Sequence, residues 1–463
     1  MIKPLIVTAH KTPREGCHAD VDMARDSDIC WHFMRVLVIG GGGREHALVW
    51  KLRQSRLASK IWCAPGNGGI SQQAECVPVN LADIPAVADL AETLRADLTV
   101  VGPEQPLVDG IADEFDRRGL RIIGPTRKWA QLEGSKVFAK DFLNQHGIPT
   151  ASVHGVYTSA QDAIRTLESL DYPVVLKADG LCGGKGVLVA RSHSEASDFV
   201  DRALEKREFG DGGGKLLIEE ALEGKELSFI VLSDGRDFVP LVPTRDHKRA
   251  FDGDLGPNTG GMGAYSCDGI ISTVVEAQIR ERVVEPTMKA LTTDANPYRG
   301  FLYFGLMLTS AGPKVLEFNC RLGDPETQAI VARMDFDLGE VLEALAEGKL
   351  GTQDLKWLPG ASVCVVMASG GYPGKYVSGK EIRGLERAEA IGGVAVYHAG
   401  TRREGAIYYT SSGRVLGVTG VGDSLDSARR GAYDAARQIQ FSDCHYRRDI
   451  GLGECRAANM GEA

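Results

Sequence analysis

The first part of the chain alternates short apolar runs with helical patterns. Residues 35–39 contain the continuous apolar run VLVI, which is typical of a strand buried on both faces of a parallel sheet. Four glycines, Gly40–Gly43, end this run, and a helical pattern comes next over residues 45–54. Further short strands are predicted at 60–63, 98–101 and 121–123, again with helical patterns between them. The alternation predicts an α/β domain with a parallel sheet, running to about residue 134.

Beyond this region, strands and helices are mixed without that regular order. A helix over 135–146 leads to a hairpin-like unit of two strands, 173–177 and 187–190, joined by a glycine-rich loop. Further elements are predicted as strands at 215–219, 226–232, 238–242, 301–308 and 314–318, and as helices at 195–206 and 274–293. After a Pro-Gly link at 358–360, short strands and a helix over 424–440 predict a small C-terminal domain. The chain thus combines α/β and α+β regions in several domains.

The composition excludes several classes of protein. The net charge of -9 and the lack of a Lys/Arg run argue against a nucleic-acid-binding protein. No apolar run approaches the ~18 residues needed to span a membrane. The ten cysteines form no C-x-x-C pair and show no zinc-ligand spacing with histidine. Scattered single cysteines of this kind predict free thiols in a reducing cytoplasm.

Residues 1–33 do not share the pattern of the rest of the chain. Their apolar stretch is too short for a signal-peptide core, and their acidic residues argue against a transit peptide. We expect a poorly ordered N-terminal extension, or a start codon upstream of the natural beginning at Met34. A regulatory or interaction arm is the alternative.

Two glycine-rich loops are candidate phosphate sites. Gly40–Gly43 joins a predicted strand to a predicted helix, where backbone N–H groups and the helix dipole favour an anion. The dinucleotide motif G-x-G-x-x-G fails there, because Glu45 or His46 stands at its third glycine. The segment KADGLCGGKG, residues 177–186, is not a Walker A loop, but its lysines suit a lid over a triphosphate. The alternatives are a bare tight turn for the first loop and an ordinary hairpin turn for the second.

The densest polar segment is DHKRAFDGDLGPNTGGMGAYS, residues 246–266. It begins with Asp246, His247, Lys248 and Arg249, and continues into a glycine-rich stretch. Because the glycines dilute any periodic apolar face, we expect neither a helix nor a plain strand here. Charge beside a backbone that allows close approach is typical of an anionic small-molecule site. A solvated surface loop is the alternative.

A second polar block, EFNCRLGDPETQ (residues 317–328), comes after a predicted strand. Alternation along that strand puts Glu317 and Asn319 on the same face. A carboxylate and an amide oxygen side by side suit Mg²⁺. Arg321 offers a planar fork to a carboxylate or phosphate. A half-exposed edge strand is the alternative.

These segments occur together in one known family. In order along the chain stand VLVIGGGGREHAL, VGPEQPLVDG, VLKADGLCGGKGV, GPNTGGMGAYS and EFNCRLGDPETQ. With these motifs, the chain from Met34 to about Gly451 resembles the phosphoribosylamine–glycine ligase (glycinamide ribonucleotide synthetase) family of the ATP-grasp superfamily. The resemblance implies that ATP, glycine and 5-phosphoribosylamine give ADP, phosphate and glycinamide ribonucleotide. The reaction would pass through a glycyl phosphate, as a step of de novo purine biosynthesis.

The resemblance also implies an order of domains. We expect an N-terminal parallel-sheet (pre-ATP-grasp) domain over 34–134, an ATP-grasp domain over 135–352 with a mobile lid at about 151–222, a small β-rich C-terminal domain over 360–451, and a tail over 452–463. The implied partners are the small-molecule substrates glycine and 5-phosphoribosylamine, with no nucleic acid and no membrane. The expected state is a cytoplasmic monomer or weak homodimer.

By resemblance, the cofactors are ATP and Mg²⁺ (or Mn²⁺). The ATP-binding residues would be Lys136, Lys177, Gly183, Gly184, Lys185, Gly186, Glu219, Glu220, Leu222 and Glu226. Glu317 and Asn319 would be the metal ligands. The catalytic residues Asp246, Lys248 and Arg321 would orient glycine and stabilise developing charge. Substrate would be bound by Gly42, Gly43, Asn67, Pro103, Glu104, Asn258, Gly263 and Asp324.

Three other classes of protein are the alternatives to this family. Another ATP-grasp ligase or carboxylase would share the ATP and metal residues, whereas VGPEQPLV and GPNTGGMGAYS favour the glycine ligase. The failed dinucleotide motif disfavours a nicotinamide dehydrogenase. A non-catalytic nucleotide-binding regulator would lack Glu317, Asn319 or Lys177, and all three are present. One departure from the family pattern lies in the lid, where Cys182 and Gly183 replace two alanines and add an oxidisable thiol.

Overall fold

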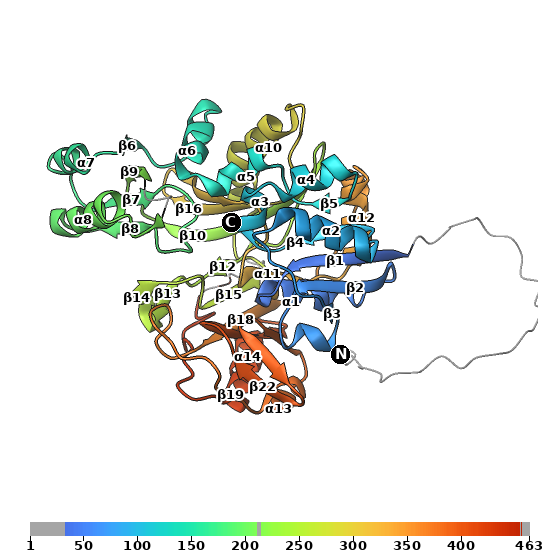
Figure 1. Ribbon diagram of the computed structural model, residues 1–463. Helices are drawn as coiled ribbons and strands as arrows, with labels where there is room; N and C mark the ends of the chain where they lie inside the picture. Colours follow the sequence, from blue (N-terminus) through green and yellow to red (C-terminus); the bar gives the residue numbers. More distant parts are fainter. Residues whose placement is uncertain (1–32, 211–213, 454, 456–463) are drawn as a thin grey trace, which may run out of the picture.

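The computed structural model describes residues 33–210, 214–453 and 455 (Figure 1). The predicted N-terminal extension, apart from Phe33, and most of the predicted tail lie outside the described residues. None of the helices in this described part combines the length and apolar character that a membrane crossing requires.

The N-terminal part is a five-stranded parallel sheet covered by helices. Its strand order is β3-β2-β1-β4-β5, with β1 in the centre. The bounds are β1 Met34–Gly40, β2 Ala58–Pro65, β3 Glu75–Cys76, β4 Leu98–Val101 and β5 Ile122–Ile123. The apolar run of β1 is buried, with Val38 beside Cys63 of β2 and Val100 of β4. The predicted parallel sheet is therefore confirmed.

The strand order creates a crevice at the carboxyl edge of this sheet. From β1 the chain continues through α1 (Gly43–Leu52) to β2 on one side, and it later reaches β4 on the other side. Such a reversal leaves a crevice beyond the carboxyl ends of the two neighbouring strands. Gly40 ends β1 and Gly102 comes directly after β4, so the two glycines border it. The remaining helices of this part are α2 (Ile84–Leu94), α3 (Glu104–Val108), α4 (Ile111–Arg118) and α5 (Arg127–Gly134).

The centre of the molecule is an antiparallel sheet with apolar side chains packed on both faces. Its order is β11-β10-β16-β17, with bounds Phe238–Pro240, Lys225–Asp234, Arg299–Thr309 and Gly312–Asn319. On one face, Phe304 and Phe318 lie with ring centres 5.4 Å apart, in a core shared with α6 (Lys136–Gln145) and α10 (Glu285–Thr292). The opposite face packs Ile230, Leu232 and Phe301 into a second core. Its other end carries charged side chains, among them Glu226 and Glu317, and forms the floor of the candidate site; we call this end the polar face.

A second antiparallel sheet stands apart from the rest of the molecule (Figure 1, left). Its order is β6-β9-β7-β8, with bounds Val153–Tyr157, Leu216–Glu220, Val174–Ala178 and Val187–Ala190. Helices α7 (Ala160–Leu167) and α8 (His193–Val200) cover one face. Its buried apolar residues form a cluster of their own. This part contains the segment predicted to be the lid, and the predicted hairpin of β7 and β8 is confirmed.

The C-terminal part is built on a sheet that also takes in strands from the middle of the chain. Its order is β12-β15-β18-β23-β20, with bounds Arg245–Asp246, Gly263–Cys267, Ala361–Ala368, Arg414–Gly422 and Val394–His398. A smaller sheet of β19 (Glu381–Ile382), β22 (Ile407–Thr410) and β21 (Thr401–Glu404) lies beside it, with α13 (Leu385–Glu389) and α14 (Leu425–Gln438). Two further helices, α11 (Glu326–Val331) and α12 (Leu338–Ala346), connect this part to the central sheet.

The prediction that residues 246–266 contain no plain strand is wrong. β13 (Arg249–Phe251) and β14 (Leu255–Asn258) form a hairpin, and β15 is buried along its whole length. The reason is a distant partner, because the small residues of β15 pair with β18, about a hundred positions later in the chain. Local composition does not reveal such a pairing.

One pair of cysteines also differs from the prediction of free thiols. Cys267, at the end of β15, forms a disulfide with Cys455, with the two Cα atoms 6.3 Å apart. The pair is separated by 188 positions, so its spacing in the sequence gave no signal. Within the described part of the chain the other cysteines are free: Cys63, Cys76, Cys182, Cys320, Cys364 and Cys444.

Candidate active site

Neighbouring strands of the central sheet aim alternate side chains at the same face. Ser228 of β10 lies beside Gly305 of β16, and Gly305 lies beside Glu317 of β17. Two positions further along β17, Asn319 lies beside Tyr303. A Cβ at Gly305 would come 2.9 Å from Cγ of Glu317, so the glycine leaves room for that carboxylate. Glu317 and Asn319 therefore share the polar face.

A lysine lies against the predicted metal ligands. Nζ of Lys248 is 3.4 Å from Oε1 of Glu317 and 3.2 Å from Oε2 of Glu226. The ammonium group lowers the pKa of Glu317, although burial acts in the opposite direction. The carboxylate of Glu317 and the amide oxygen of Asn319 fit a cation that prefers oxygen ligands. Among the described residues no group of three or more His, Cys, Asp or Glu could hold a metal ion, so phosphate oxygens and water would complete the coordination.

Asp246 lies next to this cluster, on β12. Burial raises the pKa of its carboxyl to about 8; Glu326, Glu226 and Glu317 act in the same direction, and Lys248 opposes them. Carboxylates thus outnumber the lysine at this end of the site. An excess of negative charge attracts a metal ion or the ammonium group of an amino acid.

The lid and the central sheet meet at a buried cluster of charges. The Glu219 carboxylate forms an ion pair with Lys140 Nζ at 2.7 Å and a second one with Lys177. Lys177 also donates to the carbonyl of Leu316 at 2.9 Å, directly before Glu317. The predicted ATP residues Lys177 and Glu219 are therefore brought together beside β17. The Glu219 carboxylate is engaged by the two lysines.

The other predicted adenine and ribose residues are spread over a wider area. The Glu220 carboxylate accepts the N–H of Ser152 at 3.1 Å and lies 3.5 Å from Nζ of Lys314. Leu222 comes after β9 and is half-buried, whereas Glu226 is exposed at the start of β10. Of these residues, only Glu226 reaches the charges around Lys248.

The glycine loop of the lid extends toward the C-terminal part. Lys136, at the start of α6, donates to the carbonyl of Gly180 at 2.5 Å. Gly183, Gly184 and Lys185 lie at the tip of the loop, and Gly186 is buried. A Cβ at Gly184 would lie 3.3 Å from the carbonyl oxygen of Thr259. The loop therefore closes against the GPNTGG segment.

Cys182, the departure from the family pattern, folds back into this loop. A Cβ at Gly186 would lie 2.7 Å from the Cys182 Sγ, so the thiol packs over that glycine. Burial raises the pKa of the thiol, although Lys136 acts to lower it. The thiolate, which is the oxidisable form, is therefore disfavoured.

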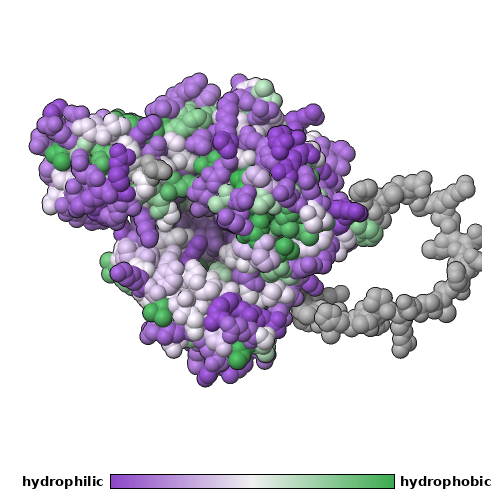
Figure 2. Space-filling view, viewed as in Figure 1, coloured by the Kyte–Doolittle hydropathy of each residue, from purple (hydrophilic) through white to green (hydrophobic). Residues whose placement is uncertain are grey.

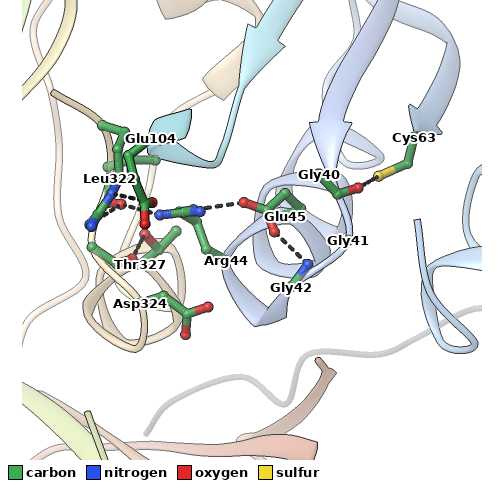
Figure 3. Close-up of polar contacts among 12 residues, drawn as sticks. Gly40, Gly41, Gly42, Arg44, Glu45, Cys63, Glu104, Leu322, Asp324 and Thr327 are labelled. Carbon is green, nitrogen blue, oxygen red and sulfur yellow. Dashed lines mark hydrogen bonds and ion pairs between the residues drawn. The ribbon is translucent and has the colours of Figure 1, made fainter. Parts of the chain in front are cut away.

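A carboxylate folds back onto the glycine loop that borders the crevice of the parallel sheet. Glu45 accepts the N–H of Gly42 at 2.5 Å and Nε of Arg44 at 2.7 Å (Figure 3). Gly40 and Gly102 leave space for it, because a Cβ at either would collide with the Glu45 side chain. The Gly42 N–H thus already has a partner, because Glu45 lies where an anion bound to this group would lie. The phosphate cradle stays a prediction for the rest of the loop.

Asn67 organises the neighbouring loops. Its Nδ2 donates to the carbonyls of Gly41 at 2.9 Å and His398 at 2.7 Å, and its Oδ1 accepts the N–H groups of Gly69 and Ile70. All its hydrogen-bonding capacity in the amide plane is engaged. The predicted substrate residue Asn67 therefore joins the N-terminal loops to the C-terminal part.

The remaining predicted substrate residues fall into two groups. Asp324 faces the crevice, where Arg414 and Arg44 lower the pKa of its carboxyl against the effect of burial (Figure 3). Arg414 comes from the start of β23 and donates to the carbonyl of Asp324 at 2.6 Å. Gly43 packs against α11, with a Cβ there 2.6 Å from Nε2 of Gln328.

Asn258 and Gly263 lie further out. Asn258 ends β14 opposite Arg249. The space beside Gly263 is filled by the carbonyl of Cys364 and by Ile450, so this glycine serves packing within the C-terminal sheet.

Arg321, two residues after the end of β17, links this strand to the crevice. Its Nε donates to Glu104 at 3.3 Å, and its Nη2 lies 2.8 Å from Oε1 of Glu133. Arg321 and Arg44 lower the pKa of Glu104 against burial, whereas burial raises the pKa of Glu133 to about 7 despite the nearby guanidinium. Pro103 is the N-cap of α3 and Glu104 is its first residue, so both predicted substrate residues border the crevice.

Sequence reasoning missed five residues of this arrangement: Arg44, Glu45, Glu133, Lys140 and Arg414. Lys140 stands one helical turn after Lys136, which was a usable signal. Arg44 and Glu45 lie within the motif VLVIGGGGREHAL. Arg414 and Glu133 reach the site only through the fold, and the sequence carried no signal for them.

The space between these groups is open to solvent. Figure 2 shows a hollow in the middle of this face, with hydrophilic residues inside it. In the arrangement of Figure 1 the hollow lies between the lid, the N-terminal sheet and the C-terminal part. Substrates can therefore enter from this side.

Comparison with known proteins gives consistent matches along the chain. Sequence models of phosphoribosylglycinamide synthetase match as its N domain over residues 34–133, its ATP-grasp (A) domain over 134–327 and its C domain over 362–453. The phosphoribosylamine–glycine ligase of Escherichia coli O6:H1 is 48% identical over 422 residues, which cover 90% of this chain and 98% of that protein.

Solved structures agree with these matches. The crystal structure of phosphoribosylamine–glycine ligase from Thermotoga maritima is 34% identical, with a TM-score of 0.76, and covers 90% of this chain and 99% of that chain. A biotin carboxylase–β,γ-ATP complex from Campylobacter jejuni is 16% identical, with a TM-score of 0.69 over 90% of this chain and 94% of that chain, and so shares the fold alone. The chain therefore belongs to the phosphoribosylglycinamide synthetase family.

Proposed function

We propose that the polar face of the central sheet, the lid and the crevice form one active site. The chain is an ATP-dependent ligase that joins glycine to 5-phosphoribosylamine in purine biosynthesis, with glycinamide ribonucleotide, ADP and phosphate as products. A carboxylate is a poor electrophile, so glycine is first phosphorylated. The amine then attacks the glycyl phosphate and phosphate leaves. Catalysis rests mostly on positioning and on neutralising charge.

ATP lies between the lid and the central sheet. Lys136, Lys177 and the loop Gly183, Gly184, Lys185, Gly186 hold its phosphates, and Glu219, Glu220, Leu222 and Glu226 border adenine and ribose. The cluster of Lys140, Glu219 and Lys177 carries a net positive charge, which suits a phosphate. The closed loop beside Thr259 supports a second role, because an acyl phosphate needs protection from water.

Glu317 and Asn319 would hold Mg²⁺ or Mn²⁺. When bound, this ion neutralises negative charge on the phosphates of ATP. Lys248, already placed between Glu226 and Glu317, supplies a positive charge on the same face. Asp246 and Arg321 act with Lys248 to orient glycine.

The acceptor occupies the crevice bordered by Gly42, Gly43, Pro103, Glu104 and Asp324. Because Glu45 already takes the Gly42 N–H, this end of the crevice offers carboxylates to a ligand. We assign it to the ribose hydroxyls and amine of phosphoribosylamine, which donate hydrogen bonds. Asn67 supports this site from a neighbouring loop, Asn258 from the end of β14 and Gly263 through packing at the start of β15. A monomer or weak homodimer stays a prediction, which size-exclusion chromatography with light scattering tests.

The observation that carries the proposal is the bond from Lys177 to the carbonyl of Leu316. It puts the lid lysine directly against the strand that bears Glu317 and Asn319. The test is ADP release with ATP and Mg²⁺, with freshly generated phosphoribosylamine, with and without glycine. ADP that appears only when both substrates are present, together with glycinamide ribonucleotide, supports the proposal. ATP binding without substrate-dependent ADP release would refute it.

A further inference from the structure

Arg321 is fixed by groups from three parts of the molecule. Its Nη2 lies 2.8 Å from Oε1 of Glu133 and donates to Oδ1 of Asn319 at 3.4 Å. Its Nε donates to Glu104 at 3.3 Å, and its Nη1 donates to the carbonyl of Leu322 at 3.2 Å. The guanidinium thus lies between a predicted metal ligand and the crevice for the acceptor. The orientation of the Arg321 guanidinium therefore affects both the predicted metal ligand and the crevice for the acceptor.

Glu133 makes the most specific of these contacts. It lies in the last turn of α5, and its side chain is 5% exposed. Oε1 faces the guanidinium of Arg321, and Oε2 accepts the backbone N–H of Cys320 at 2.7 Å. One carboxylate therefore fixes both the Arg321 side chain and the backbone between Asn319 and Arg321. Being buried, it does not reach the substrates.

Glu104 cannot do the same alone. Its side chain is 33% exposed, its contact with Arg321 is longer at 3.3 Å, and it also faces Arg44. A ligand in the crevice competes for Glu104. Glu133 has no such competitor, because it is shielded by the core around α5 and β17.

We propose that Glu133 is a positioning residue for the ligation, which holds Arg321 and the backbone after Asn319 in the geometry that the acyl phosphate requires. The proposal rests on the proposed role of Arg321 in orienting glycine. Groups that orient a residue of the site typically change activity about 10- to 100-fold when removed. Moving a group of the site by about 1 Å can lower the reaction rate by about 100-fold. A purely structural ion pair would instead alter stability and leave the turnover of folded enzyme unchanged.

The first experiment compares Glu133→Gln with the wild type. We expect kcat to fall about 10- to 100-fold while the KM for ATP stays within about 2-fold, because ATP is held by other residues. Trp129→Phe is the matched control, since Trp129 lies on the same helix and donates to the carbonyl of Asn296, away from Arg321. Near-normal kcat in Glu133→Gln overturns the proposal.

A double-mutant cycle separates positioning from a general structural effect. The amide oxygen of Glu133→Gln can still accept the Cys320 N–H, so the variant weakens only the contact with Arg321. If Glu133 acts through Arg321, then Glu133→Gln in an Arg321→Ala background changes kcat by less than about 2-fold. The same loss in both backgrounds overturns the proposal, because Glu133 would then act by another route. Normal turnover of Arg321→Ala alone refutes the role of Arg321, and that failure is distinct from a failure of Glu133.

A second variant covers the case in which Glu133→Gln does not fold. Glu133→Asp keeps the charge and withdraws the carboxylate by one methylene. We expect it to fold, as judged by circular dichroism and ATP binding without metal, and to lose kcat by about 10-fold. A folded Glu133→Asp with wild-type kcat overturns the proposal.

Discussion

Two clusters of lysine and glutamate lie on either side of the proposed ATP site, and they are built in opposite ways. In the lid cluster, Glu219 lies between Lys140 and Lys177, and all three side chains are at most 9% exposed. In the central cluster, Lys248 lies between Glu226 and Glu317, and all three are at least 34% exposed.

This difference in exposure, together with the charge of each cluster, predicts a different role for each. The lid cluster carries a net positive charge, and its three side chains are buried and paired with one another, so it is preorganised for an anion. The central cluster carries a net negative charge and is open to water. Its lysine is held by long contacts of 3.2 and 3.4 Å, which a metal ion at Glu317 can replace.

The largest expected effect comes from removing the central acid of the lid cluster. Glu219→Ala leaves two buried ammonium groups without their shared partner, and we expect a loss of about 3–5 kcal/mol in the free energy of unfolding. In the open cluster, Glu226→Ala changes it by less than about 1 kcal/mol, because that pair is exposed to solvent. Urea unfolding measures both. Equal losses of unfolding free energy in the two variants would show that the two clusters do not differ in this way.

A pH dependence is expected from Asp246, which lies next to the open cluster and has its pKa raised by burial. The pKa of Asp246 is raised in the folded state to about 8, above its unfolded value of about 4. The folded state therefore retains this proton where the unfolded chain has lost it. The resulting stabilisation is complete below about pH 4 and is lost as the pH rises through about 8.

Urea unfolding of the ligand-free protein between about pH 5 and pH 9 checks this sign. The free energy of unfolding should fall with rising pH by an amount of order 1 kcal/mol per pH unit, and Asp246→Asn should flatten the slope. If the slope of the free energy of unfolding against pH is unchanged in Asp246→Asn, then Asp246 is not the source of the pH dependence.

The smallest effect concerns the loop next to the lid cluster. Cys182→Ala removes a thiol that packs within its own loop and has a raised pKa, so we expect kcat/KM to change by less than about 3-fold. Thiol-alkylating reagents should inactivate the wild type slowly at neutral pH. Rapid inactivation that Cys182→Ala abolishes would show a reactive thiol in the lid.

Those parts of the arrangement that depend on residues close together in the sequence could be predicted from the sequence. The apolar run before Gly40–Gly43 predicted β1, and alternation on β17 put Glu317 and Asn319 on one face. The hairpin around the lid loop was predicted from two apolar strands and a glycine-rich turn. In each case neighbouring residues determine the local conformation.

The rest depends on contacts between distant positions. β15 is a strand because β18 pairs with it, and Cys267 is bonded because the chain returns to it near its end. Arg414 reaches Asp324 from 90 positions away. The glycine-rich turn of Gly40–Gly43 does not reveal that Glu45 folds back onto it and takes the N–H group of Gly42.

Magnesium-dependent turnover of Glu317→Ala, with Glu226→Ala as the matched control, tests the central claim most directly. The account predicts that Glu317→Ala loses ADP release with both substrates present, while its ATP binding without metal falls much less. Glu226→Ala should retain most of its Mg²⁺ dependence. Normal Mg²⁺-dependent turnover in Glu317→Ala would contradict the assignment of the polar face as the place where ATP, metal and glycine meet.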